Sequence, residues 1–144
     1  MLAADADYRA WLAKANNDRL NIENNLKAEQ TPWDTVCFHA QQCAEKTLKA
    51  LLVYHDTRPQ RTHDLVLLLR ECVAIDPALA DIEDVCQDLT TYAVTGRYPD
   101  LSDVGEAEGR QALAALEQIR TAMLPLLPVI DASARADTNA HPGD

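Results

Sequence analysis

The segment DTVCFHAQQCAEKTLKALLVY, residues 34–54, determines the fold class of this chain. Its apolar residues recur every three or four positions, which is the spacing of one face of an α-helix. They are Val36, Ala40, Cys43, Ala44, Leu48, Leu51 and Leu52. Alanine and leucine are abundant throughout the chain, and only 4 glycines occur in it. This composition favours helix over strand.

Helical spacing recurs on both sides of this segment, and no stretch alternates as a strand does. The sequence predicts further helices over residues 5–29, 62–74, 76–92 and 105–123. Thr62 and Asp76 are the expected N-caps of the third and fourth helices, and Pro77 suits a first turn. We therefore predict an all-α, up-and-down bundle of about five helices.

The division of the chain follows from its composition. At 144 residues it fits one domain of ordinary size. Residues 1–130 carry the helical pattern, whereas residues 131–144 are small, polar and interrupted by proline and glycine. We expect the bundle to span the first range and a disordered tail to span the second.

Charge is distributed unevenly along the chain. The formal net charge is −10, so a large sequence-independent grip on nucleic acid phosphates is not expected. Basic residues nevertheless dominate residues 46–70, and Arg97 is the lone base within residues 71–108. This pattern fits either a local phosphate site or helices that simply expose charge of both signs.

Cysteine spacing and hydropathy predict neither a metal site nor a membrane span. None of the 4 cysteines forms a C-x-x-C pair, and Cys43, Cys72 and Cys86 fall on apolar stripes, where a thiol packs as a small hydrophobe. We expect no secretory leader, and the sequence contains no long apolar run. We expect a soluble, cytoplasmic protein without metal or cofactor, and no membrane partner.

Polar residues on the first two predicted helices need separate interpretation. Asp18 lies on or beside the apolar stripe of the first helix, so its carboxylate requires a partner. An ion pair or hydrogen bond to a neighbouring helix is favoured there over a role in a site. Gln41, Glu45 and Lys49 recur every four residues, which by itself is typical of a solvated face carrying a Glu45–Lys49 ion pair.

Three blocks of sequence together resemble the HEPN domains (higher eukaryotes and prokaryotes nucleotide-binding). They are FHAQQCAEKTLKALLVY at residues 38–54, His63-Asp64-Leu65 with Leu68-Leu69, and Arg97-Tyr98-Pro99-Asp100. The resemblance covers residues 5–125. It implies a helical bundle that forms a homodimer and often works beside a minimal nucleotidyltransferase, in a toxin–antitoxin-like pair.

The resemblance also implies ribonuclease activity, but this sequence lacks part of the motif that carries that activity in the family. Ribonuclease members carry an arginine followed four to six residues later by a histidine, after the fourth helix. Arg97 matches that arginine, but no histidine follows it before Val104. Arg58 and His63 have the right spacing in the wrong loop, which we interpret as chance. We expect His63 to donate to a neighbour at the start of the third helix.

We therefore predict a module that binds a nucleotide or RNA phosphate, and we assign no catalytic residue. The predicted phosphate ligands are Arg97, Lys49, Lys46 and His63, with Asp18, Glu45, Tyr98 and Asp100 in support. A metal-independent ribonuclease with an atypical site around Arg97 is one alternative. A purely structural helical interaction protein is the other.

Overall fold

The computed structural model describes residues 7–92 and 104–128, and within these ranges every regular element is a helix. The α-helices are α1 (Tyr8–Leu26), α2 (Trp33–Tyr54), α3 (Leu65–Val73), α4 (Glu83–Thr90) and α5 (Glu106–Met123). Two 3-10 helices, η2 (Pro77–Ile82) and η5 (Leu124–Leu126), precede α4 and follow α5. The predicted all-α bundle of five helices is confirmed. The predicted tail and most of the segment between α4 and α5 lie outside the described residues.

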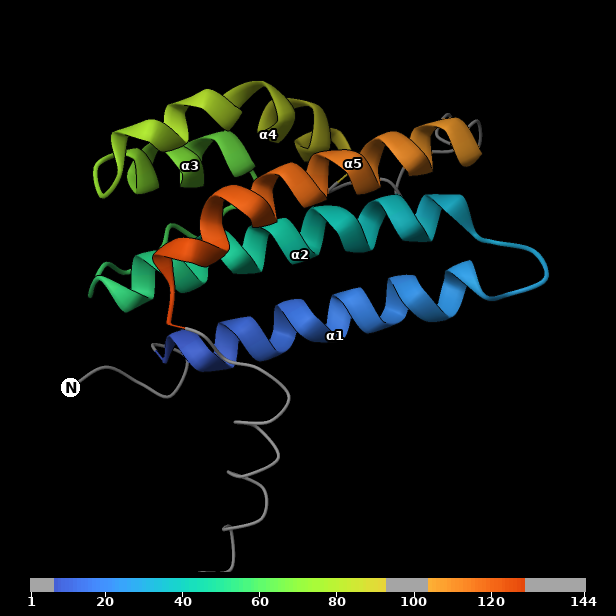
Figure 1. Cartoon of the computed structure of the whole chain (residues 1–144), viewed down its shortest axis with the longest axis horizontal. Coiled ribbons are helices and arrows are strands. Elements are labelled where there is room, and N and C mark those ends of the chain that lie inside the picture. The colour runs from blue at the N-terminus through green and yellow to red at the C-terminus, as the bar shows by residue number, and fades with distance from the viewer. Residues whose placement is uncertain (1–6, 93–103, 129–144) are drawn as a thin grey trace, which may run out of the picture.

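Helix α2 is the central element of the bundle. It runs antiparallel to α1, and α5 lies along its other side, while α3 and α4 form a further layer (Figure 1). Contacts from α1, α3, α4 and α5 leave little of α2 in water, so residues on most of its circumference are buried. The core also includes Leu68, Cys86 and Leu116, with Trp11 partly buried against it.

Aspartates begin three of the helices, and one predicted cap needs correction. The side chains of Asp7 and Asp76 accept hydrogen bonds from the backbone N–H groups of α1 and η2. Asp64, rather than Thr62, caps α3 by accepting from the N–H of Val66 at 2.9 Å. The Thr62 hydroxyl accepts instead from the Asp64 N–H at 3.0 Å, so it closes a turn before the helix begins.

The contact between α2 and α5 depends on a glycine. A Cβ atom at Gly109 would overlap the indole ring of Trp33, so only a residue without a side chain lets the helices approach this closely. The guanidinium of Arg110 lies over the same indole, 5.1 Å from its centroid. The half-buried ring of Trp33, at the start of α2, thereby packs against both residues at the start of α5.

Candidate functional site

A buried carboxylate on α2 organises the first of two polar clusters. The side chain of Glu45 is 4% exposed, and its Oε2 accepts from Lys49 Nζ at 2.9 Å. Its Oε1 lies 2.9 Å from Nδ1 of His63, in the loop between α2 and α3. Gln41 Nε2 donates to the main-chain carbonyl of His63 at 2.8 Å. We call Gln41, Glu45, Lys49 and His63 the Glu45 cluster.

The helix face that carries Gln41, Glu45 and Lys49 is buried, whereas their spacing had indicated a solvated face. Gln41, Glu45 and Lys49 were expected to face water, yet all three are buried. The predicted Glu45–Lys49 ion pair does form, but away from solvent. The reason is that α1 covers the end of Lys49, whose ammonium lies 5.3 Å from the centroid of the Trp11 ring. The α2–α3 loop covers Glu45 through His63.

A second cluster repeats this chemistry between α1 and α2. Asp18 Oδ2 accepts from Lys46 Nζ at 2.8 Å, and Oδ1 lies 2.8 Å from His39 Nδ1. The Asp18 side chain is 6% exposed, whereas those of His39 and Lys46 are each 21% exposed. We call these three residues the Asp18 cluster. The prediction that Asp18 pairs with a neighbouring helix is confirmed.

Hydrogen bonds besides the Glu45 contact fix the end of the loop that presents His63. Gln41 holds the main-chain carbonyl of His63, and Asp64 caps α3. The N–H of Leu65 donates to the hydroxyl of Thr90 on α4 at 3.0 Å. Gln41 therefore holds the backbone of His63, and Glu45 holds its ring. Its side chain remains 65% exposed, so the ring edge opposite Glu45 faces water.

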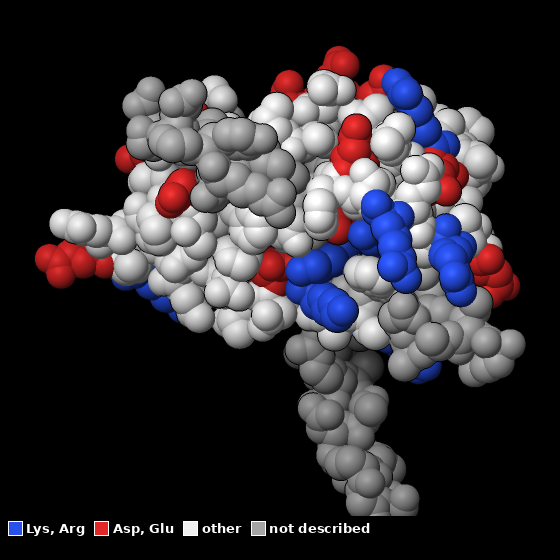
Figure 2. Space-filling model, turned by 180° about the vertical axis from the view of Figure 1, so that it is seen from behind, with Lys and Arg blue, Asp and Glu red and all other residues white. Residues whose placement is uncertain are grey.

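Exposed basic residues accompany His63 in this loop. Arg58 and Arg61 are exposed, and neither forms an ion pair with another residue in the described part of the chain. Figure 2 shows Lys and Arg side chains gathered on one side of the molecule. That side carries the start of α1 and the end of α2. We call Arg58, Arg61 and His63 the basic loop.

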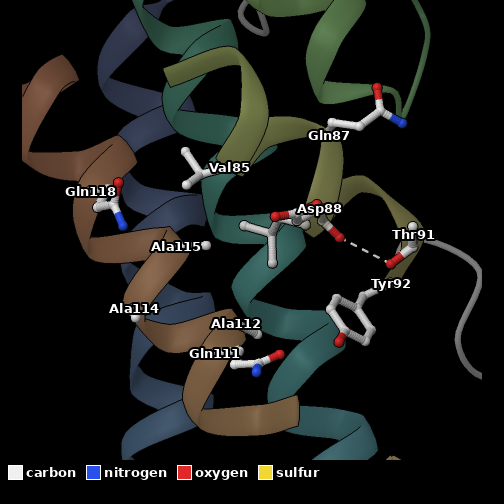
Figure 3. Close-up of a pocket in the computed structure, with 11 residues that line it drawn as sticks. Val85, Gln87, Asp88, Thr91, Tyr92, Gln111, Ala112, Ala114, Ala115 and Gln118 are labelled. Carbon is white, nitrogen blue, oxygen red and sulfur yellow. Dashed lines mark hydrogen bonds between the residues drawn. The ribbon is translucent and has the colours of Figure 1, made fainter. Parts of the chain in front are cut away.

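A groove between α4 and α5 has a different character. It measures about 780 Å³ and is lined by Asp88 and Tyr92 on one side and by Gln111, Ala115 and Gln118 on the other (Figure 3). Its described lining contains no Lys, Arg or His. Because the one charged residue in this described lining is the carboxylate of Asp88, the described part of the groove does not suit an anionic ligand.

The four cysteines are core residues rather than site residues. All are free and buried. Burial raises the pKa of the Cys37 and Cys43 thiols to about 11 and that of the Cys72 and Cys86 thiols to about 12. Thiols held protonated in this way are poor nucleophiles and poor metal ligands. No group of three metal-ligating side chains forms among the described residues.

The predicted site residues divide into three groups. Glu45, Lys49 and His63 lie together, as the prediction of one site requires. Lys46 and Asp18 form the neighbouring cluster, so the charge of Lys46 is already balanced by a carboxylate. Arg97, Tyr98 and Asp100, also expected at the site, lie outside the described residues.

Four further residues at these clusters had no assigned site role in the sequence. Gln41 and His39 are partners of His63 and Asp18, and Arg58 and Arg61 accompany His63 in the loop. The four-residue recurrence of Gln41 with Glu45 and Lys49 was the signal available for Gln41.

No helix among the described residues is long and apolar enough to cross a membrane.

Comparisons with known proteins agree with this architecture. A sequence model of the HEPN domain matches residues 8–126. The fold is similar to that in the crystal structure of TT1696 from Thermus thermophilus, with a TM-score of 0.67 and 26% sequence identity. That match covers 83% of this chain and 98% of the other. No curated protein matches the chain significantly in sequence.

Proposed function

The chain belongs to the HEPN domain family, and on that premise we propose that it is a helical module that binds the phosphate of a nucleotide or an RNA. HEPN domains are nucleotide- and RNA-related modules, which sets the ligand class. The observation that carries the proposal is the basic loop, three exposed nitrogen-bearing side chains on a protein of net charge −10. Guanidinium groups bind phosphate well, and those of Arg58 and Arg61 pair with no carboxylate among the described residues.

The roles within this site follow from burial and pairing. Arg58 and Arg61 contact the phosphate directly, and His63, when both of its ring nitrogens carry a proton, donates a further hydrogen bond from Nε2 on its exposed ring edge. Lys49, which is 10% exposed and paired with Glu45, supports the loop and adds to the local positive potential. Lys46 does the same from the Asp18 cluster.

Arg97 completes the proposed site by its match to the family's phosphate-handling arginine. Tyr98 and Asp100 belong to the same block and support it. We expect Arg97→Ala to weaken nucleotide or RNA binding by about 1.5–3 kcal/mol, the usual worth of a hydrogen bond to a charged group. If the variant binds as the parent does but melts lower, Arg97 is structural.

Assembly is part of the proposal. Members of the family commonly form oligomers, and a two-fold dimer would bring two copies of the site to one ligand. We propose that the chain is a homodimer and acts with a nucleotidyltransferase partner in a toxin–antitoxin-like pair. Sedimentation at micromolar concentration should give a dimer, and co-expression with a minimal nucleotidyltransferase should give a co-purifying complex. A persistent monomer would contradict the shared site.

Binding is tested most directly by removing the loop cations. Calorimetric titration of the full chain with a nucleoside triphosphate or a short RNA should show affinity falling at least about tenfold in Arg58→Ala/Arg61→Ala, equivalent to about 1.4 kcal/mol. The matched control is Arg110→Ala, because Arg110 is also exposed but lies on α5 and pairs with Glu106. Affinity should also fall with added salt. Equal losses in both variants would indicate general charge alone.

A further inference from the structure

The reactivity of a histidine ring depends on its exposure to solvent and on whether a carboxylate faces one of its nitrogens. The described histidines differ in these two properties. His39 has a carboxylate at Nδ1 but is 21% exposed. His55 is exposed, with its ring packed edge-on against Tyr54 at 5.2 Å and no ring hydrogen bond among the described residues. His63 has both features, because it is 65% exposed and its Nδ1 lies 2.9 Å from Glu45.

The contact with Glu45 determines which nitrogen of His63 can react. A carboxylate accepts hydrogen bonds, so the ring nitrogen that faces it carries the proton. Oε2 of Glu45 accepts from Lys49, whereas Oε1 lies 2.9 Å from the ring nitrogen and 3.4 Å from the amide nitrogens of Gln41 and Gln42. Nε2 of neutral His63 therefore holds its lone pair on the side away from Glu45. No described residue forms a hydrogen bond with that nitrogen.

We propose that His63 is a phosphoryl-acceptor residue. Its donor would be a phosphoryl compound with a good leaving group, such as an acyl phosphate, a phosphoramidate or a nucleoside triphosphate. The Nε2 lone pair forms a bond to phosphorus, and the bond from phosphorus to the leaving group breaks with its electron pair going to that group. The product is a phosphohistidine.

The surroundings of His63 suit each stage of this step. When Nε2 attacks, the ring becomes positively charged, and the carboxylate of Glu45 at Nδ1 stabilises that charge. The ring then loses its Nδ1 proton, which Glu45 Oε1 accepts before it passes to water. Arg58 and Arg61, in the same exposed loop, stabilise the negative phosphoryl group. The inference shares these arginines with the proposed phosphate site, but the nucleophile does not require a nucleotide to bind there.

The first test compares histidines within the unmodified full chain. The protein is incubated with phosphoramidate, and the labelled residues are identified by fragment mass spectrometry. Phosphorus NMR distinguishes attachment at Nε2 from attachment at Nδ1. We expect acid-labile label at Nε2 of His63, forming about tenfold faster than at His39 or His55, the scale of effect of a partner that orients a ring. If His55 is labelled as fast as His63, exposure alone explains the reactivity and the proposal is wrong.

The second test removes the carboxylate without removing the histidine. Glu45→Gln is made together with Lys49→Met, because Glu45→Gln alone would leave a buried ammonium unpaired. Circular dichroism verifies that the double variant is folded. The labelling rate of His63 should fall to that of His55. An unchanged rate would overturn the assignment, since Glu45 would then serve only to hold the loop.

The outcomes for this inference and for the proposed function are separable. Nucleotide titration of unlabelled protein tests binding, and phosphoramidate labelling tests the nucleophile without any nucleotide. A chain that labels at His63 but binds no nucleotide keeps this inference and loses the proposed function. A chain that binds nucleotide but labels no faster at His63 than at His55 keeps the proposed function and loses this inference.

Discussion

Each of the two polar clusters contains a carboxylate, a lysine and a histidine, and the clusters differ in how far these groups are shielded from water. In the Asp18 cluster both partners of the carboxylate are a fifth exposed, and all three groups lie on paired helices. In the Glu45 cluster the shielding is graded, from 10% exposure at Lys49 to 65% at His63. The first arrangement braces two helices against each other. The Glu45 cluster instead holds the exposed ring of His63 with buried groups, which is the arrangement that a functional site requires.

The largest effect should follow from removing the more buried carboxylate. Glu45→Ala leaves the ammonium of Lys49 in a shielded position without its acceptor, whereas the amide of Gln41 keeps the main-chain carbonyl of His63. We expect the free energy of unfolding to fall by about 3–5 kcal/mol in a urea titration, as for a broken buried pair. Adding Lys49→Met should recover much of this loss. Failure to recover any of it would mean that Glu45 acts mainly through His63 and the loop.

Removing the other carboxylate should have a smaller effect. Asp18→Ala leaves His39 and Lys46 without an acceptor, but both side chains are exposed enough to reach water. We expect a loss of about 1–3 kcal/mol in the same titration. Glu23→Ala, an exposed acid on the same helix, is the control and should be nearly neutral. A loss larger than that of Glu45→Ala would reverse the ranking of the two clusters.

The two histidines should separate stability from reactivity. His39→Ala removes a contact that is shielded between helices, so we expect a loss of about 1 kcal/mol. His63→Ala removes a mostly exposed ring and should lower stability by less than about 1 kcal/mol. The labelling experiment should give the opposite order, with His63→Ala abolishing most of the label. If the two substitutions had equal effects on both stability and labelling, the Asp18 cluster would not be the structural cluster and the Glu45 cluster would not be the reactive one.

The helices were predictable because their apolar periodicity is local, whereas the clusters depend on contacts between distant residues. Glu45 and Lys49 look like an exposed ion pair from their spacing, because nothing near them in sequence reveals that α2 is covered on several sides. His63 lies 18 positions from Glu45, and its ring direction is set by the α2–α3 loop and the cap of α3. Periodicity carries no information about such a loop.

The same distinction explains the smaller differences between prediction and structure. Thr62 and Asp64 are both good caps, and the choice between them was decided by the turn that Thr62 closes with the Asp64 N–H. Asp18 was easier to interpret, because a carboxylate on an apolar stripe requires some partner whatever the fold. Its partners His39 and Lys46 could be identified only once α1 was placed against α2.

The order of helix packing has a consequence for folding kinetics. Helices α1 and α2, α2 and α3, α3 and α4, and α4 and α5 are neighbours in the chain and also pack together, so most of the bundle assembles through short-range contacts. The contact of α5 with α2 instead closes a long stretch of chain and should form late. Core truncations such as Ile119→Val on α5 should then accelerate unfolding while leaving the refolding rate almost unchanged. Stopped-flow measurements of both rates would place the docking of α5 after the transition state.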